Sequence, residues 1–460
     1  MTAVKQLFRK KSSYDVNMSE GSIVGHLLTF AFPLLLGNLF QQLYNMVDTW
    51  VVGNFVGSAA FSAVGTVGPI INTLIGFFVG LSSGAGVVIS QYYGAGKNDG
   101  VKKTVHTAYA VTLIMGVAFT VIGMLMTPLS LKMMNTPASV MPSSKTYLLI
   151  YFAGIIFMMV YNIGSGILRA VGDSRRPFYF LVVSAITNTG LDLLFVLAFD
   201  MGVAGVALAT VIAQALSAVL VTLALIKSKG SVRLEPPALR IHTSELARIV
   251  RVGIPAGLQM AVTSFSNVFV QSYINHFGKD CMAGWTAYAK IDQLLFLPMQ
   301  SLSLAATTFV GQNLGAKQVK RAEKGVLYAI GISVAITLVL ILPVELFASE
   351  LVSFFNGEAA VITYGARFLR WLSPFYVLCC VNQICAGALR GSGNSRAPMF
   401  IMLGSFVLFR QAYLFVMANY VSNTIIPISM SYPAGWLLCS VLMFLYYKFV
   451  GLSKSKLIDH

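Results

Sequence analysis

Four polar residues are spaced along one otherwise apolar segment near the N-terminus. The segment is 31–53, AFPLLLGNLFQQLYNMVDTWVVG. Its polar residues are spaced three or four positions apart and are Asn38, Gln41, Asn45 and Asp48. In a helix of 3.6 residues per turn, these side chains share one face. A carboxylate in the hydrocarbon of a membrane costs several kcal/mol unless it faces protein or water. We therefore interpret the face as a cavity wall with Asp48 as a functional charge; for the three amides the alternative is a polar seam between helices.

The composition indicates a membrane protein. Hydrophobic residues make up 57% of the 460 residues and charged residues only 10%, whereas soluble domains carry roughly 25% charged residues. The apolar runs reach the length of about 20 residues that a membrane-spanning helix needs, without the alternation of a β-barrel. The first run is too long for a cleavable signal peptide. We expect an all-α membrane protein.

Twelve apolar runs are separated by segments rich in Gly, Pro and charge. Their approximate limits are 26–53, 60–88, 103–127, 145–168, 177–199, 202–226, 246–275, 283–309, 325–346, 362–388, 397–420 and 425–449. The predicted domains are a cytoplasmic N-terminal segment (1–25), an N-lobe (26–226), a linker (227–245), a C-lobe (246–450) and a cytoplasmic tail (451–460).

Basic residues predict the orientation in the membrane. The net charge is +16, but all but seven of the 32 Lys and Arg residues fall in the two termini and in every second loop. Because cytoplasmic loops are enriched in Lys and Arg, we expect both termini in the cytoplasm of a bacterial-type plasma (inner) membrane. This placement explains the basic charge without nucleic acid as a partner.

Other motifs predict neither a cofactor nor an enzyme. The five cysteines and five histidines form no metal-binding or disulfide pattern. The loops GAGKNDG and GDSRR lack the spacing of a phosphate-binding loop, and we interpret them as short cytoplasmic turns.

The second half of the chain repeats the first. GILRAVGDSRRP starts at Gly166 and GALRGSGNSRAP starts at Gly387, an offset of 221 residues. An even number of spans in each copy makes the copies parallel, related by an axis along the membrane normal. Two pseudo-symmetric bundles around a central cavity are typical of alternating-access transporters.

Two acids of the first half are predicted to lie at equal depth. Asp192 follows Asn188 by one helical turn. At 1.5 Å per residue, Asp48 and Asp192 both lie roughly 10 Å below the outer boundary, and Thr210 falls at about the same depth. Two neighbouring carboxylates in a low dielectric can share a proton, or can bind Na⁺ together with Asn and Thr oxygens. The coupling ion is therefore H⁺ or Na⁺, with a possible Na⁺ site at the two acids.

The second half lacks this acid pair, because Val270 and Tyr413 stand at the corresponding positions. Its first span instead carries on one face Gln259, Thr263 and Asn267, which we interpret as the opposite cavity wall. The third buried acid, Asp292, has Lys290 nearby and Arg410 in another span. An internal ion pair is favoured here over a role in binding substrate.

Several motifs together resemble the multidrug and toxic compound extrusion (MATE) family. They are the paired loops GDSRRP and GNSRAP, the segments SQYYGAG and VGQNLGA, and the opening FPLLLGNLFQQLYNMVD. The resemblance covers essentially the whole chain. It implies two six-helix lobes forming a V, and antiport of amphipathic, often cationic compounds against H⁺ or Na⁺.

The resemblance also implies an ion-coupling network in the N-lobe. The branch similar to DNA-damage-inducible transporters has an Asp on span one, an Asn on span four, an Asn and an Asp on span five and a Thr on span six. The matching positions here are Asp48, Asn162, Asn188, Asp192 and Thr210. The Na⁺-coupled branch has C-lobe acids, and Gln259 departs from that pattern.

We therefore expect a secondary active multidrug efflux antiporter that exports small-molecule drugs or metabolites as a monomer in the lipid bilayer. The alternative is a lipid-linked oligosaccharide flippase of the same superfamily, although such proteins more often have fourteen spans and a basic cavity. A membrane-embedded enzyme lacks support, since the sequence shows no metal, nucleophile or phosphate motif.

Overall fold

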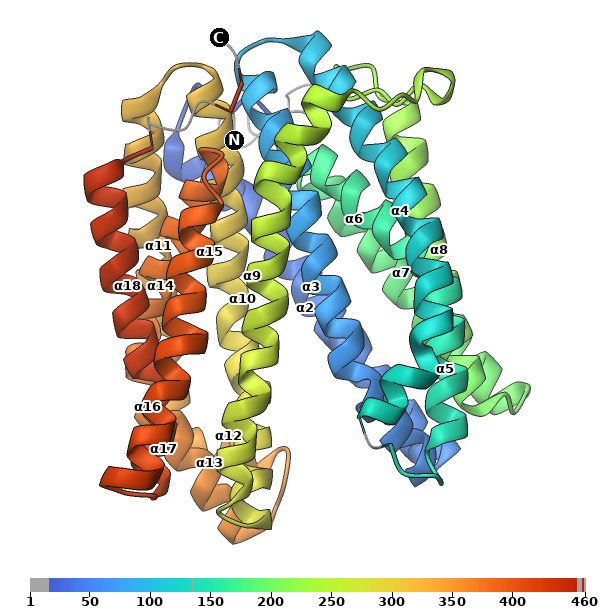
Figure 1. Ribbon diagram of the computed structural model, residues 1–460, viewed down its shortest axis with the longest axis vertical. Coiled ribbons are helices and arrows are strands. Elements are labelled where there is room, and N and C mark those ends of the chain that lie inside the picture. The colour runs from blue at the N-terminus through green and yellow to red at the C-terminus, as the bar shows by residue number, and fades with distance from the viewer. Residues whose placement is uncertain (1–15, 135, 453–456, 459–460) are drawn as a thin grey trace, which may run out of the picture.

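The computed structural model describes residues 16–134, 136–452 and 457–458 (Figure 1). Parts of the predicted N-terminal segment and tail therefore lie outside the described residues. All regular structure in the described ranges is helical. Ten described helical segments are long and apolar enough to cross a membrane, and α5 with α6, joined at a 47° bend, makes an eleventh. The predicted all-α membrane fold is confirmed.

The N-lobe is built from seven α-helices, two of which continue as π-helices. They are α2 (Ile23–Val51) with η1 (Val52–Val56), α3 (Ser58–Gly94), α4 (Asn98–Met133), α5 (Met141–Ala153), α6 (Ile155–Ala170), α7 (Arg175–Leu193) with η2 (Leu194–Ala198), and α8 (Gly202–Ile226). A linker that contains the 3₁₀ turn η3 (Pro236–Ala238) leads to the second lobe.

The C-lobe repeats this order with more interruptions. Its elements are α9 (Thr243–Asn275), α10 (Lys279–Gly315), α11 (Val319–Leu346), α12 (Ala348–Ser353), α13 (Ala359–Leu372), η4 (Ser373–Phe375), α14 (Tyr376–Gly391), α15 (Arg396–Leu403), η5 (Gly404–Phe409), α16 (Arg410–Val416), η6 (Met417–Val421), α17 (Ile425–Ser429) and α18 (Ser431–Val450). The 33-residue α9 is long enough to be the twelfth span. Three charged residues, Glu245, Arg248 and Arg251, occupy its first turns.

The two lobes form a V. In Figure 1 they meet at the end where the described part of the chain begins and ends, here called the termini end, and diverge toward the opposite far end. The contacts between lobes run mainly from α3 to α9 and α10, and from α2 to α10. The helix α2 belongs to both lobes: Leu27, Phe30 and Leu34 pack into the C-lobe core, whereas Val51 and Val52 pack into a far-end N-lobe cluster.

Glycine allows the helix backbones of the two lobes to touch. A Cβ atom on Gly94 would lie 1.9 Å from the carbonyl oxygen of Gln312, and one on Gly315 would lie 2.0 Å from that of Gln91. The same glutamines bond across the interface: Gln91 Nε2 donates to the Gly391 carbonyl and Gln312 Nε2 donates to the Ala170 carbonyl, both at 2.9 Å. The repeat thus produces a reciprocal, pseudo-symmetric joint, which holds the termini end together.

A charged cluster reinforces this joint. Arg248 of α9 donates to Glu245 at 2.7 Å and to the Tyr92 hydroxyl of α3 at 2.8 Å. Glu245 also accepts a hydrogen bond from Thr104 of α4 at 3.2 Å. The first turns of α9, in the C-lobe, are therefore tied to two N-lobe helices.

We predict that Gly315→Ala separates the lobes at the termini end. The added methyl group overlaps the backbone of α3, and overpacking of this kind costs typically about 1–3 kcal/mol. Distances between spin labels at two exposed termini-end positions, one on each lobe, should lengthen in the variant. Gly331→Ala is the matched control, because a Cβ there has no neighbour within 4 Å; unchanged distances in Gly315→Ala would contradict the prediction.

Candidate functional site

The structure brings the two N-lobe acids together. The carboxyl groups of Asp48 on α2 and Asp192 on α7 interact directly. Asp192 is completely buried. Asp48 Oδ1 and both oxygens of Asp192 have no hydrogen-bond donor among the described protein groups. No Lys, Arg or His forms an ion pair with either acid in the described ranges.

Two adjacent carboxyl groups without a basic partner require a proton or a cation between them. Asn188, one turn before Asp192 on α7, is 2% exposed, and neither its Oδ1 nor its Nδ2 has a hydrogen-bond partner among the groups that the structure describes. The site thus offers uncommitted oxygen atoms from two acids and one amide on adjacent helices. This set of oxygen ligands suits H⁺ or a hard cation such as Na⁺. No group of three or more His, Cys, Asp or Glu with the arrangement of a metal site occurs among the described residues.

Both acid-bearing helices change to π-helix just beyond the acid. Helix α2 becomes η1 at Val52, four residues after Asp48, and α7 becomes η2 at Leu194, two residues after Asp192. The two π-helices contact each other. Such π segments are often found at functional sites.

Tyrosines that the sequence analysis missed surround the acids. Tyr44 and Tyr147 lie close enough to interact electrostatically with Asp48, and Tyr147 also faces Asp192. Tyr147 is stacked on Tyr151, with 6.5 Å between ring centroids. Tyr44 could have been found, since it lies one turn before Asp48 on the same face. Tyr147 could not, because nothing in its local sequence indicates which helix it faces.

Two further residues of the predicted network use their side chains within their own helices. Asn162 Nδ2 donates to the Met158 carbonyl at 2.9 Å and Thr210 Oγ1 to the Val206 carbonyl at 3.0 Å. Neither is hydrogen-bonded to an acid among the described residues. Their assignment to the coupling site remains a prediction.

The polar residues along one face of α2 do not share one environment. Asn38 faces the other lobe, where its Nδ2 lies 3.5 Å from Ser301 Oγ on α10. Gln41 interacts with Tyr44, and Asn45 is exposed. The polar-seam alternative therefore fits Asn38, while Asn45 lies on an accessible surface.

The three residues of the predicted cavity wall on α9 also lie in different environments. Gln259 is 6% exposed and packs with its Nε2 at 2.8 Å from Met402 Sδ of α15. Thr263 is partly buried, with no partner for Oγ1 among the described groups. Asn267 is exposed, and its Oδ1 accepts a hydrogen bond from Arg410 at 2.8 Å.

The favoured ion pair around Asp292 is not formed among the described residues. Asp292 accepts hydrogen bonds from the hydroxyl groups of Tyr288 and Tyr376. Arg410 instead bonds to α9 and lies over the Tyr432 ring at 4.7 Å from its centroid. Lys290 is exposed. Asp292 is thus stabilised by hydroxyl groups, and Arg410 by α9 and an aromatic ring, where the sequence analysis expected opposite charges.

A repeated two-lobe bundle of membrane-spanning helices, with an unpaired acid pair in one lobe, defines a membrane transporter. Comparison with known proteins specifies the family. A family model described as MatE matches residues 33–194 and 255–415, once in each lobe. The chain belongs to the MATE family, a family of multidrug transporters.

Similar proteins agree with this assignment. The chain is 30% identical to "Probable multidrug resistance protein YoeA" of Bacillus subtilis over 95% of this chain and 96% of that protein. It is 29% identical to "Probable multidrug resistance protein YpnP" of the same organism, over 95% and 97% of the two chains. A solved structure titled "Outward-facing conformation of a multidrug resistance MATE family transporter of the MOP superfamily" has the same fold, with a TM-score of 0.91 at 23% identity over 97% of this chain and 100% of that chain. These relatives do not favour the flippase alternative.

We predict that Asp292→Leu destabilises the C-lobe, because it leaves two tyrosine hydroxyls without their acceptor. An unsatisfied buried hydroxyl costs about 1–3 kcal/mol. Asp292→Asn keeps an acceptor oxygen and should lose clearly less. Thermal unfolding of the purified protein in detergent measures both variants. An equal loss in both would show that the charge of Asp292 matters, and would contradict the hydroxyl network as its main partner.

Proposed function

We propose that the protein is a secondary active multidrug antiporter of a bacterial-type plasma membrane, with both termini in the cytoplasm. It exports amphipathic or cationic small molecules, and H⁺ or Na⁺ enters in exchange. The observation that carries the proposal is the adjacent pair Asp48 and Asp192, which lies within one lobe and has no basic partner in the described part of the chain. Such a pair is stable only with a bound cation, so its occupancy can report the ion gradient.

The arrangement of the lobes supports alternating access. They are joined at the termini end and separate toward the far end (Figure 1). With the termini in the cytoplasm, this is an outward-open arrangement. The transported molecule leaves from it while the ion enters from outside and binds the acid pair. The coupling is reciprocal, because an ion that favours one arrangement of α2 lowers the affinity for a molecule that favours the other.

Accessible polar and apolar side chains on the helices that contact the opposite lobe support a small organic substrate. Asn45 of α2 and Asn267 of α9 are exposed, and Gln271 of α9 is half-buried, on helices that also contact the opposite lobe. Trp50 and Met46, 55% and 45% exposed, add apolar surface to α2. A monomer is sufficient, since each lobe contributes one wall.

We predict that an imposed ion gradient drives uptake of a fluorescent organic cation into liposomes that contain the protein. One set of liposomes carries a pH gradient and another a Na⁺ gradient, which identifies the ion. Asp48→Asn and Asp192→Asn should each lower gradient-driven transport by at least about tenfold, the factor that corresponds to 1.4 kcal/mol, since an amide cannot exchange a proton and binds Na⁺ more weakly.

Asp200→Asn is the matched control in the same lobe, because Asp200 is exposed and its positive φ of 51° is tolerated by Asn. This variant should transport like the wild type. Gradient-driven transport by a folded Asp48→Asn variant at the wild-type rate would falsify the coupling assignment. Transport of no organic cation under either gradient would count against the export of cationic drugs.

A further inference from the structure

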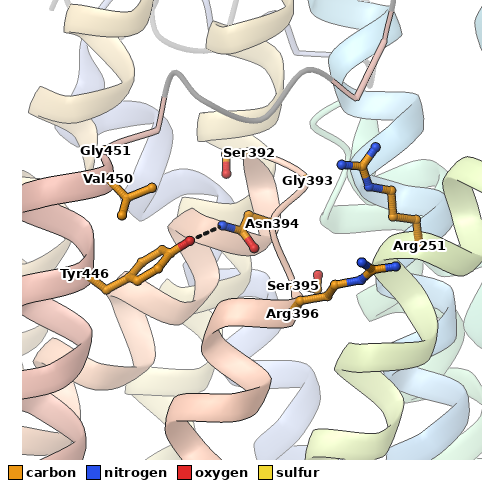
Figure 2. A pocket seen from close by; sticks show the side chains of 9 residues that line it. All are labelled: Arg251, Ser392, Gly393, Asn394, Ser395, Arg396, Tyr446, Val450 and Gly451. Carbon is orange, nitrogen blue, oxygen red and sulfur yellow. Dashed lines mark hydrogen bonds between the residues drawn. The ribbon is translucent and has the colours of Figure 1, made fainter.

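A cavity of about 320 Å³ lies at the termini end of the C-lobe (Figure 2). Its wall consists of the loop from Ser392 to Ser395, the first residue of α15, one residue of α9 and the end of α18. The predicted coupling site plays no part in it, since both acids belong to the other lobe. The cavity therefore needs an explanation of its own.

The cavity is lined by positive charge only. Arg251 of α9 and Arg396 of α15 are both exposed, and Figure 2 shows their guanidinium groups on the same side of the cavity. Neither forms an ion pair with a carboxylate among the described residues. No Asp or Glu is among the lining residues. An anion would therefore be attracted to this wall.

A buried hydroxyl group in the wall lacks a partner. Ser395 stands at the N-cap of α15 and is 1% exposed, yet its side chain makes no capping hydrogen bond, and Oγ has no partner among the described groups. The neighbouring Asn394 is occupied: its Nδ2 donates to the Tyr446 hydroxyl at 2.8 Å and its Oδ1 accepts from the Ala397 amide at 3.3 Å. The free hydroxyl and the N-terminus of α15 both favour an anion.

The internal repeat supplies a direct comparison. In the N-lobe loop, Asp173 stands where the C-lobe has Asn394. Its Oδ1 accepts from the amides of Arg175 and Arg176 at 3.0 and 3.1 Å, and its Oδ2 contacts the Arg176 side chain. The N-lobe thus places its own carboxylate at the N-terminus of α7. The C-lobe keeps the first arginine as Arg396, but Asn394 replaces the acid and Ala397 replaces Arg176, whose side chain contacts that acid. The C-lobe loop therefore has no carboxylate beside Arg396.

We propose that the C-lobe cavity binds a phosphate group, which bonds to Arg251, Arg396 and the Ser395 hydroxyl. Two arginine forks, a serine hydroxyl and a helix N-terminus are the groups that bind phosphate most effectively. The phosphate can come from an anionic lipid headgroup or from solution. The apolar residues of α18 next to the cavity include Phe449, which is 75% exposed. They suit a lipid whose headgroup enters the cavity.

The test compares two probes on the full-length protein purified in detergent. Binding of inorganic phosphate is measured by calorimetry, and retention of phosphatidylglycerol against phosphatidylcholine is measured by native mass spectrometry. Phosphate binding alone identifies a soluble source, and preferential retention of phosphatidylglycerol identifies a lipid. The wild type should bind at least one of the two probes.

Asn394→Asp is the decisive variant, because it restores the residue that the N-lobe already carries and should fold normally. Its carboxylate puts a negative charge in the cavity wall and should lower binding roughly tenfold or more, as should Arg396→Gln, the loss expected for one charge-assisted contact. Lys448→Gln is the control of equal charge, exposed at the same end of α18 but outside the cavity lining. The proposal is overturned if the wild type binds neither probe, if both cavity variants bind like the wild type, or if Lys448→Gln loses as much as Arg396→Gln.

Discussion

The contact of helix backbones at the termini end is the constraint on which the rest of the structure depends. Gly94 and Gly315 each lie against the other lobe's glutamine carbonyl, so no side chain separates the helices there. Because Gln91 and Gln312 also bond to carbonyls at helix C-termini of the opposite lobe, each residue of the joint has a counterpart from the repeat. Two bundles that touch at one end and cross at an angle are separated at the other end. This gives the molecule its V shape.

The two halves share one helix arrangement, but their buried acids have different partners. The N-lobe has two carboxyl groups in contact, and three of their four oxygens have no hydrogen-bond partner among the described residues. The C-lobe has one carboxyl group held by two tyrosine hydroxyls and an arginine held by α9. The acid of the C-lobe is thus satisfied by fixed donors, whereas the acids of the N-lobe depend on a mobile ion. Coupling and structural support are divided between two copies of one fold.

The sequence could predict the features that follow from periodicity and repetition. Depth counting brought Asp48 and Asp192 together, because both lie a similar number of residues from an outer helix end, and the repeated motifs predicted two six-span halves. Contacts that depend on helix rotation could not be predicted: Gln259 packs on Met402, and Asp292 bonds to tyrosines rather than to Lys290 or Arg410. Periodicity defines which side chains share a face, but the neighbour of that face is decided by how the helices pack against one another.

Helix α2 links the acid pair of the N-lobe to the contact between the lobes. Its first half packs into the C-lobe core and its Asn38 reaches α10, whereas its second half carries Asp48 to α7 and continues as a π-helix against the N-lobe. A change at the acid pair therefore acts on a helix whose other half is fixed to the opposite lobe. In the proposed mechanism, loss of the shared cation makes the two carboxylates repel each other and weakens the hold of α7 on α2. The adjoining π segments, whose hydrogen-bond ladder is already irregular, are where the helix can yield. An ion bound in one lobe can thus alter the angle between the two.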